Sequence, residues 1–177
     1  MEREINQAGL DMIKSFEGLK LHPYPDSVHV PTIGYGTIMY KDGRKVTLQD
    51  PPITEAEATD LLMWEIDQKC AGIEKYVTAT INDNQYAALV SFAYNLGLGA
   101  LHGSTLLKLL NANGPSQAVA DQFLKWDHAG GVAVSGLTRR RQAEHALFMQ
   151  PVVQSDEQPS TEDVDSKLQT LEDDIMK

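Results

Sequence analysis

The chain has 177 residues, of which 42% are hydrophobic and 23% charged, so it is long enough for one ordinary core and has the composition of a soluble globular protein. The net charge of −10 argues against a nucleic-acid partner, because binding phosphates requires clustered Lys and Arg side chains. The sequence contains no run of about 18 apolar residues, the length that a membrane-spanning helix needs. We therefore expect no stable membrane insertion.

The N-terminus and the single cysteine are typical of a protein made in a reducing cytosol. The first residues, MEREINQ, carry charges where a signal peptide has a basic and then an apolar region. Cys70 has no partner for an internal disulfide, so we expect it to be a small core residue. The five histidines are scattered without metal-ligand spacing, which predicts no metal site; they are His22, His29, His102, His128 and His145.

The first part of the chain predicts one helix followed by a small β-rich lobe. Asn6 is a candidate N-cap and Gly18 a candidate end, with apolar residues at helical spacing between them. This places Glu17 at the C-terminus of the helix. After it, prolines, glycines and the turn-like KDGRK at 41–45 favour short strands and turns, so we expect a β-rich lobe over about residues 18–50.

Helices are predicted over about residues 55–150. Thr54 with Glu57 forms a capping-box signature, and the apolar spacing predicts a long helix over 55–77. Asn82 with Gln85 opens another helix, which should end near Gly97. Further helices are expected at about 105–112, 116–126 and 137–149, with a loop at 127–136.

The predicted architecture is α+β, with a small β-rich lobe and a larger helical lobe joined by a long helix. A ligand is expected in the cleft between the two lobes, since pockets form preferentially at such junctions.

The last part of the chain, residues 151–177, has a different composition. It holds eight Asp and Glu residues against two Lys residues and begins with a polar, proline-bearing linker. Val164, Leu168, Leu171 and Ile175 then follow at helical spacing, which predicts a short amphipathic helix within 160–177. Such a helix is marginal alone in water. It could dock on its own domain, fray in solution, or mediate self-association or partner binding.

Three residues near the start of the chain suggest glycosidic-bond cleavage. This chemistry uses two carboxyl groups, one to protonate the leaving oxygen and one to manage the positive charge and the attacking water. Glu17 follows an apolar helix, where partial desolvation and the helix dipole favour its protonated form. Asp26 lies in a polar loop that favours ionisation, and the Thr32 hydroxyl can hold a water. The alternative is a solvated Glu17 with Asp26 as a turn former.

The spacing of these residues resembles that of a known family. Glu17, Asp26 and Thr32 are separated by eight and five residues within FEGLKLHPYPDSVHVPTIGYGT at 16–37. This segment resembles the catalytic segment of the phage-type lysozymes, glycoside hydrolase family 24, and the resemblance covers about residues 5–150. It continues, in order and spacing, through FAYNLGLGALHGSTLLKLLN (92–111) and FLKWDHAGGVAVSGLTRRRQAEHALF (123–148).

The resemblance implies a lysozyme-like catalytic domain over residues 1–150. The implied activity is that of a muramidase, which hydrolyses the β-1,4 bond between N-acetylmuramic acid and N-acetylglucosamine in bacterial peptidoglycan, without a metal or organic cofactor. Glu17 is then the general acid, while Asp26 and Thr32 stabilise charge and orient the water. The family inverts the anomeric centre, so we expect a carboxylate separation near the roughly 6.5–9.5 Å of inverting enzymes.

The resemblance also implies residues that contact the sugar or the acid. Ile38, Tyr94 and Thr105 fall near family positions that line the sugar cleft, although Tyr94 fits a packing role equally well. One arginine of the run 139–141 is expected to pair with the acidic site, and a solvent-facing role fits at least one of the three.

The biological role implied is that of a phage or prophage endolysin. It would accumulate in the host bacterial cytoplasm as a monomer and reach the wall after a separate pore-forming protein opens the membrane. A lytic transglycosylase is an alternative, because it cleaves the same bond with the acid alone. A virion or assembly component is another, in which a lysozyme fold binds peptidoglycan and residues 160–177 make the oligomer.

Overall fold

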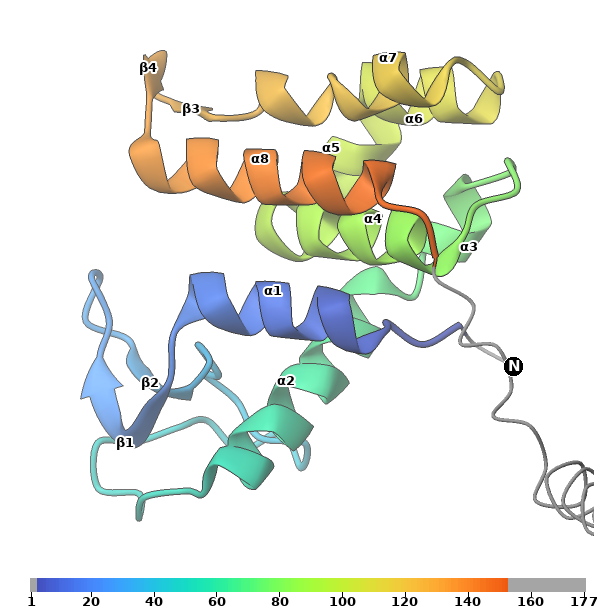
Figure 1. The fold of residues 1–177 in the computed structure, drawn as a ribbon. Helices are drawn as coiled ribbons and strands as arrows, with labels where there is room; N and C mark the ends of the chain where they lie inside the picture. The colour runs from blue at the N-terminus through green and yellow to red at the C-terminus, as the bar shows by residue number, and fades with distance from the viewer. Residues whose placement is uncertain (1–2, 153–177) are drawn as a thin grey trace, which may run out of the picture.

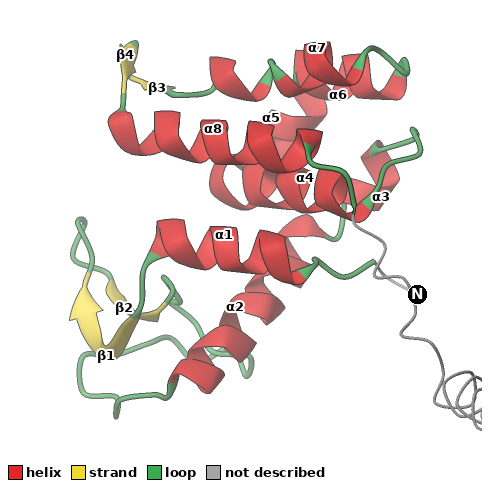
Figure 2. Ribbon diagram, viewed as in Figure 1, coloured by secondary structure: helices red, strands yellow, loops and turns green. Residues whose placement is uncertain are grey.

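The computed structural model describes residues 3–152. The segment expected to form the amphipathic helix, 160–177, lies outside the described residues. Helices dominate, and each of the two sheets is a small antiparallel pair (Figures 1 and 2). The α+β expectation is confirmed. In chain order the elements are α1 (Gln7–Glu17), β1 (Lys20–Pro25), β2 (Pro31–Gly34), α2 (Glu55–Cys70), α3 (Ile73–Tyr76), α4 (Asp83–Leu96), α5 (Leu98–Gly103), α6 (Thr105–Asn111), α7 (Ser116–Ala120), the 3₁₀ turn η1 (Phe123–Lys125), β3 (His128–Ala129), β4 (Val132–Ala133) and α8 (Ser135–Met149).

Helix α1 begins and ends where its sequence predicts. The Asn6 side chain accepts a hydrogen bond from the Gly9 backbone amide at 3.0 Å, which satisfies an amide that has no partner within the helix. Gly18 ends the helix with φ of 72°, a conformation that glycine adopts without steric cost. Glu17 is therefore the last residue of α1. The helix lies between the β1–β2 hairpin and the pair α4 and α8 (Figure 1).

The β-rich lobe is built around a single hairpin. Strand β1 pairs antiparallel with β2, so that Tyr24 lies opposite Thr32 and Pro25 opposite Pro31. The connection between the strands begins at Asp26. Helix α2 packs against both β2 and α4, and it therefore joins this lobe to the helical one.

The prediction of one continuous helix over 55–77 is wrong. The capping box of Thr54 and Glu57 is present at its start, but α2 ends at Cys70 and a separate turn, α3, follows. Gly72 lies at the break. Glycine costs a helix about 1 kcal/mol relative to alanine, and a Cβ at this position would lie 3.1 Å from the Leu98 side chain. The change of direction also places Ile73 in the core, where it is fully buried.

The predicted helix over 116–126 is also interrupted. Helix α7 ends at Ala120, and the chain continues as the 3₁₀ turn η1. A 3₁₀ helix has three residues per turn, so residues three apart share a face. Phe123 and Trp126 consequently both meet the ring of Phe92 edge-on, at centroid distances of 5.7 and 5.3 Å.

The hairpin of β3 and β4 and the helix α5 were not predicted. The expected loop 127–136 contains the hairpin of β3 and β4, whose two connecting residues, Gly130 and Gly131, both have positive φ; such a Gly-Gly connection matches the twist of paired strands. Helix α5 occupies the glycine-rich segment after Gly97, which reads as a loop. The other bounds agree within two residues: α6 matches the expected 105–112, and α8 starts before the expected 137.

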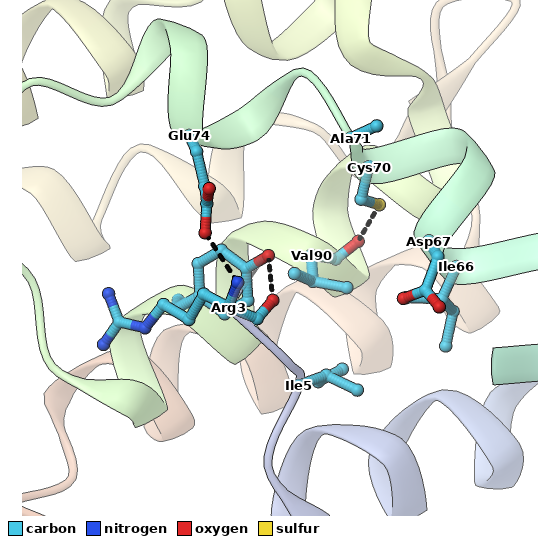
Figure 3. A pocket seen from close by; sticks show the side chains of 9 residues that line it. Arg3, Ile5, Ile66, Asp67, Cys70, Ala71, Glu74 and Val90 are labelled. Atoms are coloured by element: carbon cyan, nitrogen blue, oxygen red, sulfur yellow. Dashed lines mark hydrogen bonds between the residues drawn. The ribbon is translucent and has the colours of Figure 1, made fainter. Parts of the chain in front are cut away.

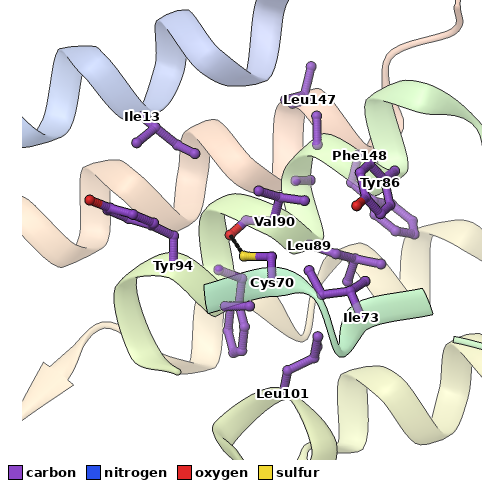
Figure 4. Close-up of a cluster of buried hydrophobic side chains, with 14 of the residues drawn as sticks. Ile13, Cys70, Ile73, Tyr86, Leu89, Val90, Tyr94, Leu101, Leu147 and Phe148 are labelled. Carbon is purple, nitrogen blue, oxygen red and sulfur yellow. Dashed lines mark hydrogen bonds between the residues drawn. The ribbon is translucent and has the colours of Figure 1, made fainter. Parts of the chain in front are cut away.

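The hydrophobic core surrounds helix α4, whose residues from Tyr86 to Tyr94 are all buried. A helix that is covered on every side belongs to the interior. Figure 4 shows side chains from α1, α2, α5 and α8 converging on it, including the free thiol of Cys70. The expectation that Cys70 is a core residue is confirmed. This packing holds α1 and α8 against the same central helix and so determines where their polar residues meet.

Candidate active site

Glu17 meets an arginine of the helical lobe. Its Oε1 accepts a hydrogen bond from Nη1 of Arg140 at 2.6 Å, and the two side chains are 25% and 5% exposed. The Phe16 ring lies against the same guanidinium, with its centroid 5.6 Å from Cζ. Of the run 139–141, Arg140 is thus the residue that pairs with the acid. Arg139 is exposed and Arg141 is fully buried.

Asp26 is held by the turn that it begins. Its Oδ1 accepts hydrogen bonds from the backbone amides of Val28 at 2.9 Å and Val30 at 2.8 Å, and His29 adopts a φ of 64° within the turn. Asp26 therefore does act as a turn former, as the alternative interpretation expected. These contacts use one oxygen, and in the part of the chain that the structure describes Oδ2 receives no hydrogen bond.

Thr32 is buried beside this turn. Its Oγ1 donates to the carbonyl of Val30 at 2.9 Å, and the residue is 3% exposed. The hydroxyl proton is therefore engaged with the same residue whose amide binds Asp26. The oxygen keeps acceptor capacity, because a hydroxyl has two lone pairs.

Tyr24 lies beside Thr32, and sequence reasoning missed it. It is opposite Thr32 in the hairpin, so the two side chains lie on the same face of the strand pair. Burial, and then the negative charges of Asp26 and Glu17, raise the pKa of its hydroxyl.

Tyr94 packs between two helices near the acid. Its hydroxyl donates to Oε2 of Glu65 at 3.2 Å, and Nζ of Lys69 lies 4.1 Å from its ring centroid. Burial, followed by the charges of Glu65 and Glu17, raises its pKa above the usual range. The packing role is thus present, and the residue also lies within electrostatic reach of Glu17.

The other two residues expected to bind sugar lie on separate elements. Ile38 is exposed in the segment after β2, and Thr105 is exposed at the first position of α6. The Ile38 side chain has no hydrogen-bonding group, and within residues 3–152 no hydrogen bond joins the Thr105 side chain to Glu17. Their role in binding, and the carboxylate separation, stay predictions.

Two negative observations concern only the part of the chain that the structure describes. No group of three or more His, Cys, Asp and Glu side chains there is arranged to hold a metal ion. No helix there combines the length and apolar character needed to cross a membrane.

A hollow elsewhere in the molecule is too small for a substrate. Figure 3 shows the residues around it, among them Arg3, Cys70 and Val90, and its volume is about 30 Å³. This is room for a water or two. The candidate site residues Glu17, Asp26, Thr32 and Arg140 do not line it.

Taken together, the fold and the site define a class. A small β hairpin carrying Asp26 and Thr32 faces the end of a helix carrying Glu17, and a helical lobe supplies the arginine. This is a lysozyme-like arrangement. The family profile described as phage lysozyme matches residues 14–144, so the chain belongs to the phage lysozyme family.

Individual relatives agree with this assignment. The endolysin of Bacillus phage B103 is 43% identical over 145 residues, which cover 82% of this chain and 54% of that protein. The chain thus spans about half the length of this relative, and the same holds for the endolysin of Bacillus phage PZA, at 55%. The endolysin of Salmonella phage P22 is 38% identical over 146 residues. The match covers 82% of this chain and 98% of that protein.

Solved structures confirm the lysozyme-like fold. A mutant of P22 lysozyme matches with a TM-score of 0.77 and 36% identity, covering 84% of this chain and all of that one (100%). An endolysin from Escherichia coli O157:H7 phage FAHEc1 matches with a TM-score of 0.77 and 34% identity, covering 85% of this chain and 96% of that one. The muramidase domain of SpmX from Asticaccaulis excentricus matches with a TM-score of 0.71 and 28% identity, covering 85% of this chain and 100% of that one.

Proposed function

We propose that this protein is an endolysin that acts as a muramidase. It hydrolyses the β-1,4 bond between N-acetylmuramic acid and N-acetylglucosamine in bacterial peptidoglycan, with inversion and without a cofactor. The observation that carries the proposal is the pairing of Glu17, at the end of α1, with Arg140 of the helical lobe, next to the hairpin that carries Asp26 and Thr32. The names of the relatives, endolysin and muramidase domain, support it.

Glu17 is the proposed general acid. Arg140 engages its Oε1, and no described residue hydrogen-bonds to Oε2, so this oxygen is free to carry the proton to the leaving sugar oxygen. The partial exposure of the side chain, 25%, leaves it accessible to a substrate. Once the proton has left, the guanidinium stabilises the carboxylate that remains.

Asp26 and Thr32 are proposed to serve the attacking water and the positive charge on the sugar. The two backbone amides on Oδ1 of Asp26 hold the carboxyl group in one orientation, with Oδ2 left to face the anomeric carbon or the water. The oxygen of Thr32 accepts from the same water. Inversion requires room for this water, which is why we expect roughly 6.5–9.5 Å between the two carboxyl groups.

A lytic transglycosylase is the principal alternative, since it needs only the acid. The arrangement of Asp26, Thr32 and Tyr24 around one turn favours hydrolysis, because a transglycosylase has no water to activate. The two reactions leave different ends: hydrolysis yields a reducing N-acetylmuramic acid, and transglycosylation an anhydro sugar.

Product analysis by mass spectrometry tests the proposal. Purified peptidoglycan is digested with the parent protein, with Glu17→Gln, and with Glu55→Gln, the same change at an exposed position of α2. We expect reducing N-acetylmuramic acid ends from the parent and the Glu55 variant only. Anhydro ends would establish the transglycosylase, and equal products from the Glu17 variant would remove Glu17 from the mechanism. NMR of the first product to form then reports the anomer, α for inversion.

The biological setting is part of the same proposal. The protein accumulates in the host cytoplasm, reaches the wall through a separate pore-forming protein and works as a monomer. A virion component that assembles through residues 160–177 is the alternative. Comparing the mass of the full chain in solution with that of a chain ending at Val152 tests it; this end point keeps the hydrogen bonds from Asn84 to the carbonyls of Gln150 and Pro151. Equal monomer masses would exclude assembly through the tail.

A further inference from the structure

Behind the Glu17–Arg140 pair lies a buried charged network that neither the fold nor the proposed reaction requires. Glu144 and Arg141 are both fully buried, and Arg140 is nearly so. All three lie on α8, where residues three and four apart share a face. The cost of removing such groups from water is several kcal/mol each, so a core of this kind calls for an explanation.

The network fixes the guanidinium of Arg140 on the sides that do not face Glu17. Its Nε donates to Oε1 of Glu144 at 3.4 Å, and its Nη2 donates to the backbone carbonyl of Ser91 at 3.3 Å. The Ser91 hydroxyl also donates to Oε1 of Glu144, at 2.7 Å. Nη1 is thereby left to Glu17. In this orientation each nitrogen of the guanidinium donates a hydrogen bond.

The same carboxylate also neutralises the second arginine. Nε of Arg141 lies 3.1 Å from Oε2 of Glu144, and its Nη2 donates to Asn95 at 2.7 Å. The four charged groups, two guanidiniums and two carboxylates, sum to zero when Glu17 is ionised and to one positive charge when Glu17 carries its proton. Without Glu144, the two buried guanidiniums of α8 would have only Glu17, which contacts Arg140, as a carboxylate partner among the described residues.

We propose that Glu144 is a positioning residue, which orients Arg140 through its Nε edge and balances one of the two buried guanidinium charges of α8 behind Glu17. The inference rests on the proposed function of Glu17 as a general acid. A protonated acid is needed for that role, and an uncompensated guanidinium 2.6 Å away opposes it. Glu144 lets the arginine bind the spent carboxylate without preventing its reprotonation.

Glu144 has polar and charged neighbours on several helices. On α8 its charged partners are Arg140 and Arg141. From α4 the facing polar group is the Ser91 hydroxyl, and from α1 the facing charge is Glu17, through Arg140. On the α7 and η1 side, Asp121 pairs with His145, and Lys125 is exposed. Burial raises the pKa of Glu144 to about 6, while Arg141, Ser91 and Arg140 favour its charged form.

The titration of Glu17 itself is the sharpest test, because it needs no turnover. It is followed by carbon NMR of the side-chain carboxyl, assigned by its loss in Glu17→Gln. Glu144→Gln should lower the titration midpoint of Glu17 by about one pH unit, a tenfold change in proton affinity. Arg141→Met should raise it by a similar amount, and the double variant, in which the charge is balanced again, should return it toward the parent. Glu55→Gln is the matched control.

The pH dependence of kcat/KM provides the second measurement. The alkaline limb, which reports loss of the protonated acid, should move to lower pH in Glu144→Gln and to higher pH in Arg141→Met, with the KM changed less than the kcat. Glu144→Asp, which keeps the charge, should leave the limb in place and lower the rate. Circular dichroism at each pH confirms folding, and Glu144→Asp and Arg141→Met carry the test if the Gln variant does not fold.

The outcomes separate this inference from the proposed function. Folded variants whose Glu17 midpoint stays within a few tenths of the parent would overturn the positioning role, even if the protein is an active muramidase. If the parent makes no reducing ends while the midpoint moves as expected, the network acts on Glu17 and the proposed reaction is what fails.

Discussion

Nη1 of Arg140 lies 2.6 Å from Oε1 of Glu17, although 123 positions separate the two residues. The contact joins the C-terminus of α1 to α8, so the orientation of the Glu17 carboxylate depends on the helical lobe. Its partners on the other side, Glu144 and Ser91, are buried, so a change at Arg140 affects both the site and the core.

Arg140→Lys is expected to lower kcat about 100-fold, because an ammonium cannot hold Glu144, Ser91 and Glu17 with one planar fork and the acid is then misplaced. Arg140→Met should also destabilise the fold by about 3 kcal/mol, since it removes one partner of a buried carboxylate. Wall-lysis kinetics and urea unfolding measure the two effects. Arg139→Lys, on the exposed side of the same helix, is the control, and an equal loss there would contradict the assignment.

Asp50 should make the β-rich lobe sensitive to acid. Hydrogen bonds from the Thr47 backbone amide and hydroxyl, Tyr40 and Arg44 lower its pKa from 3.8 to about 2. A carboxyl group whose pKa is lower in the folded than in the unfolded protein stabilises the fold at pH values above its unfolded pKa. This stabilisation is lost as the pH falls from about 4 to about 2. Asp50→Asn should therefore lower Tm by a few degrees at pH 7 and much less at pH 2. A difference that persists unchanged at pH 2 would show that its charge is not the cause.

Gly9→Ala should separate α1 from α4. A Cβ at this position would lie 2.5 Å from the Cβ of Ala87 and 2.9 Å from the Ile5 side chain, and overpacking of this kind costs about 1–3 kcal/mol. Gly136→Ala is the matched control: it lies in α8, where an added Cβ meets nothing within 4 Å, and the better helix former should gain a few tenths of a kcal/mol. Equal midpoints of urea unfolding for the two variants would rule out close packing at Gly9.

Cys70 should be almost unreactive in the native protein. Its thiol is buried against the Val90 carbonyl, with Sγ at 3.8 Å, and burial raises its pKa to about 12 although Lys69 opposes this. The thiolate, the reactive form, is then about one part in ten thousand at pH 8, and the adjoining hollow of about 30 Å³ admits no reagent. Labelling with a thiol reagent should be at least about 100-fold slower than in urea. Fast native labelling would mean that the core around α4 opens locally.

Much of the fold could be predicted because its signals are local. Asn6, Thr54 and Asn82 begin helices through hydrogen bonds to amides three residues ahead, and Gly18 and Gly97 end them in conformations that other residues avoid. The breaks within 55–77 and 116–126 were not predicted. They arise from the need to place Ile73 and Phe123 in the core, which periodicity within a helix does not register.

The sequence by itself determined that Glu17 ends a helix and that Asp26 and Thr32 follow in a hairpin, because caps, turns and strand pairs act over a few residues. Only the tertiary structure decided which arginine meets Glu17 and that Glu144 is buried behind it. These contacts depend on how α1 and α8 pack on α4. Since charges act through space, their effect is known only when the chain has brought distant residues together.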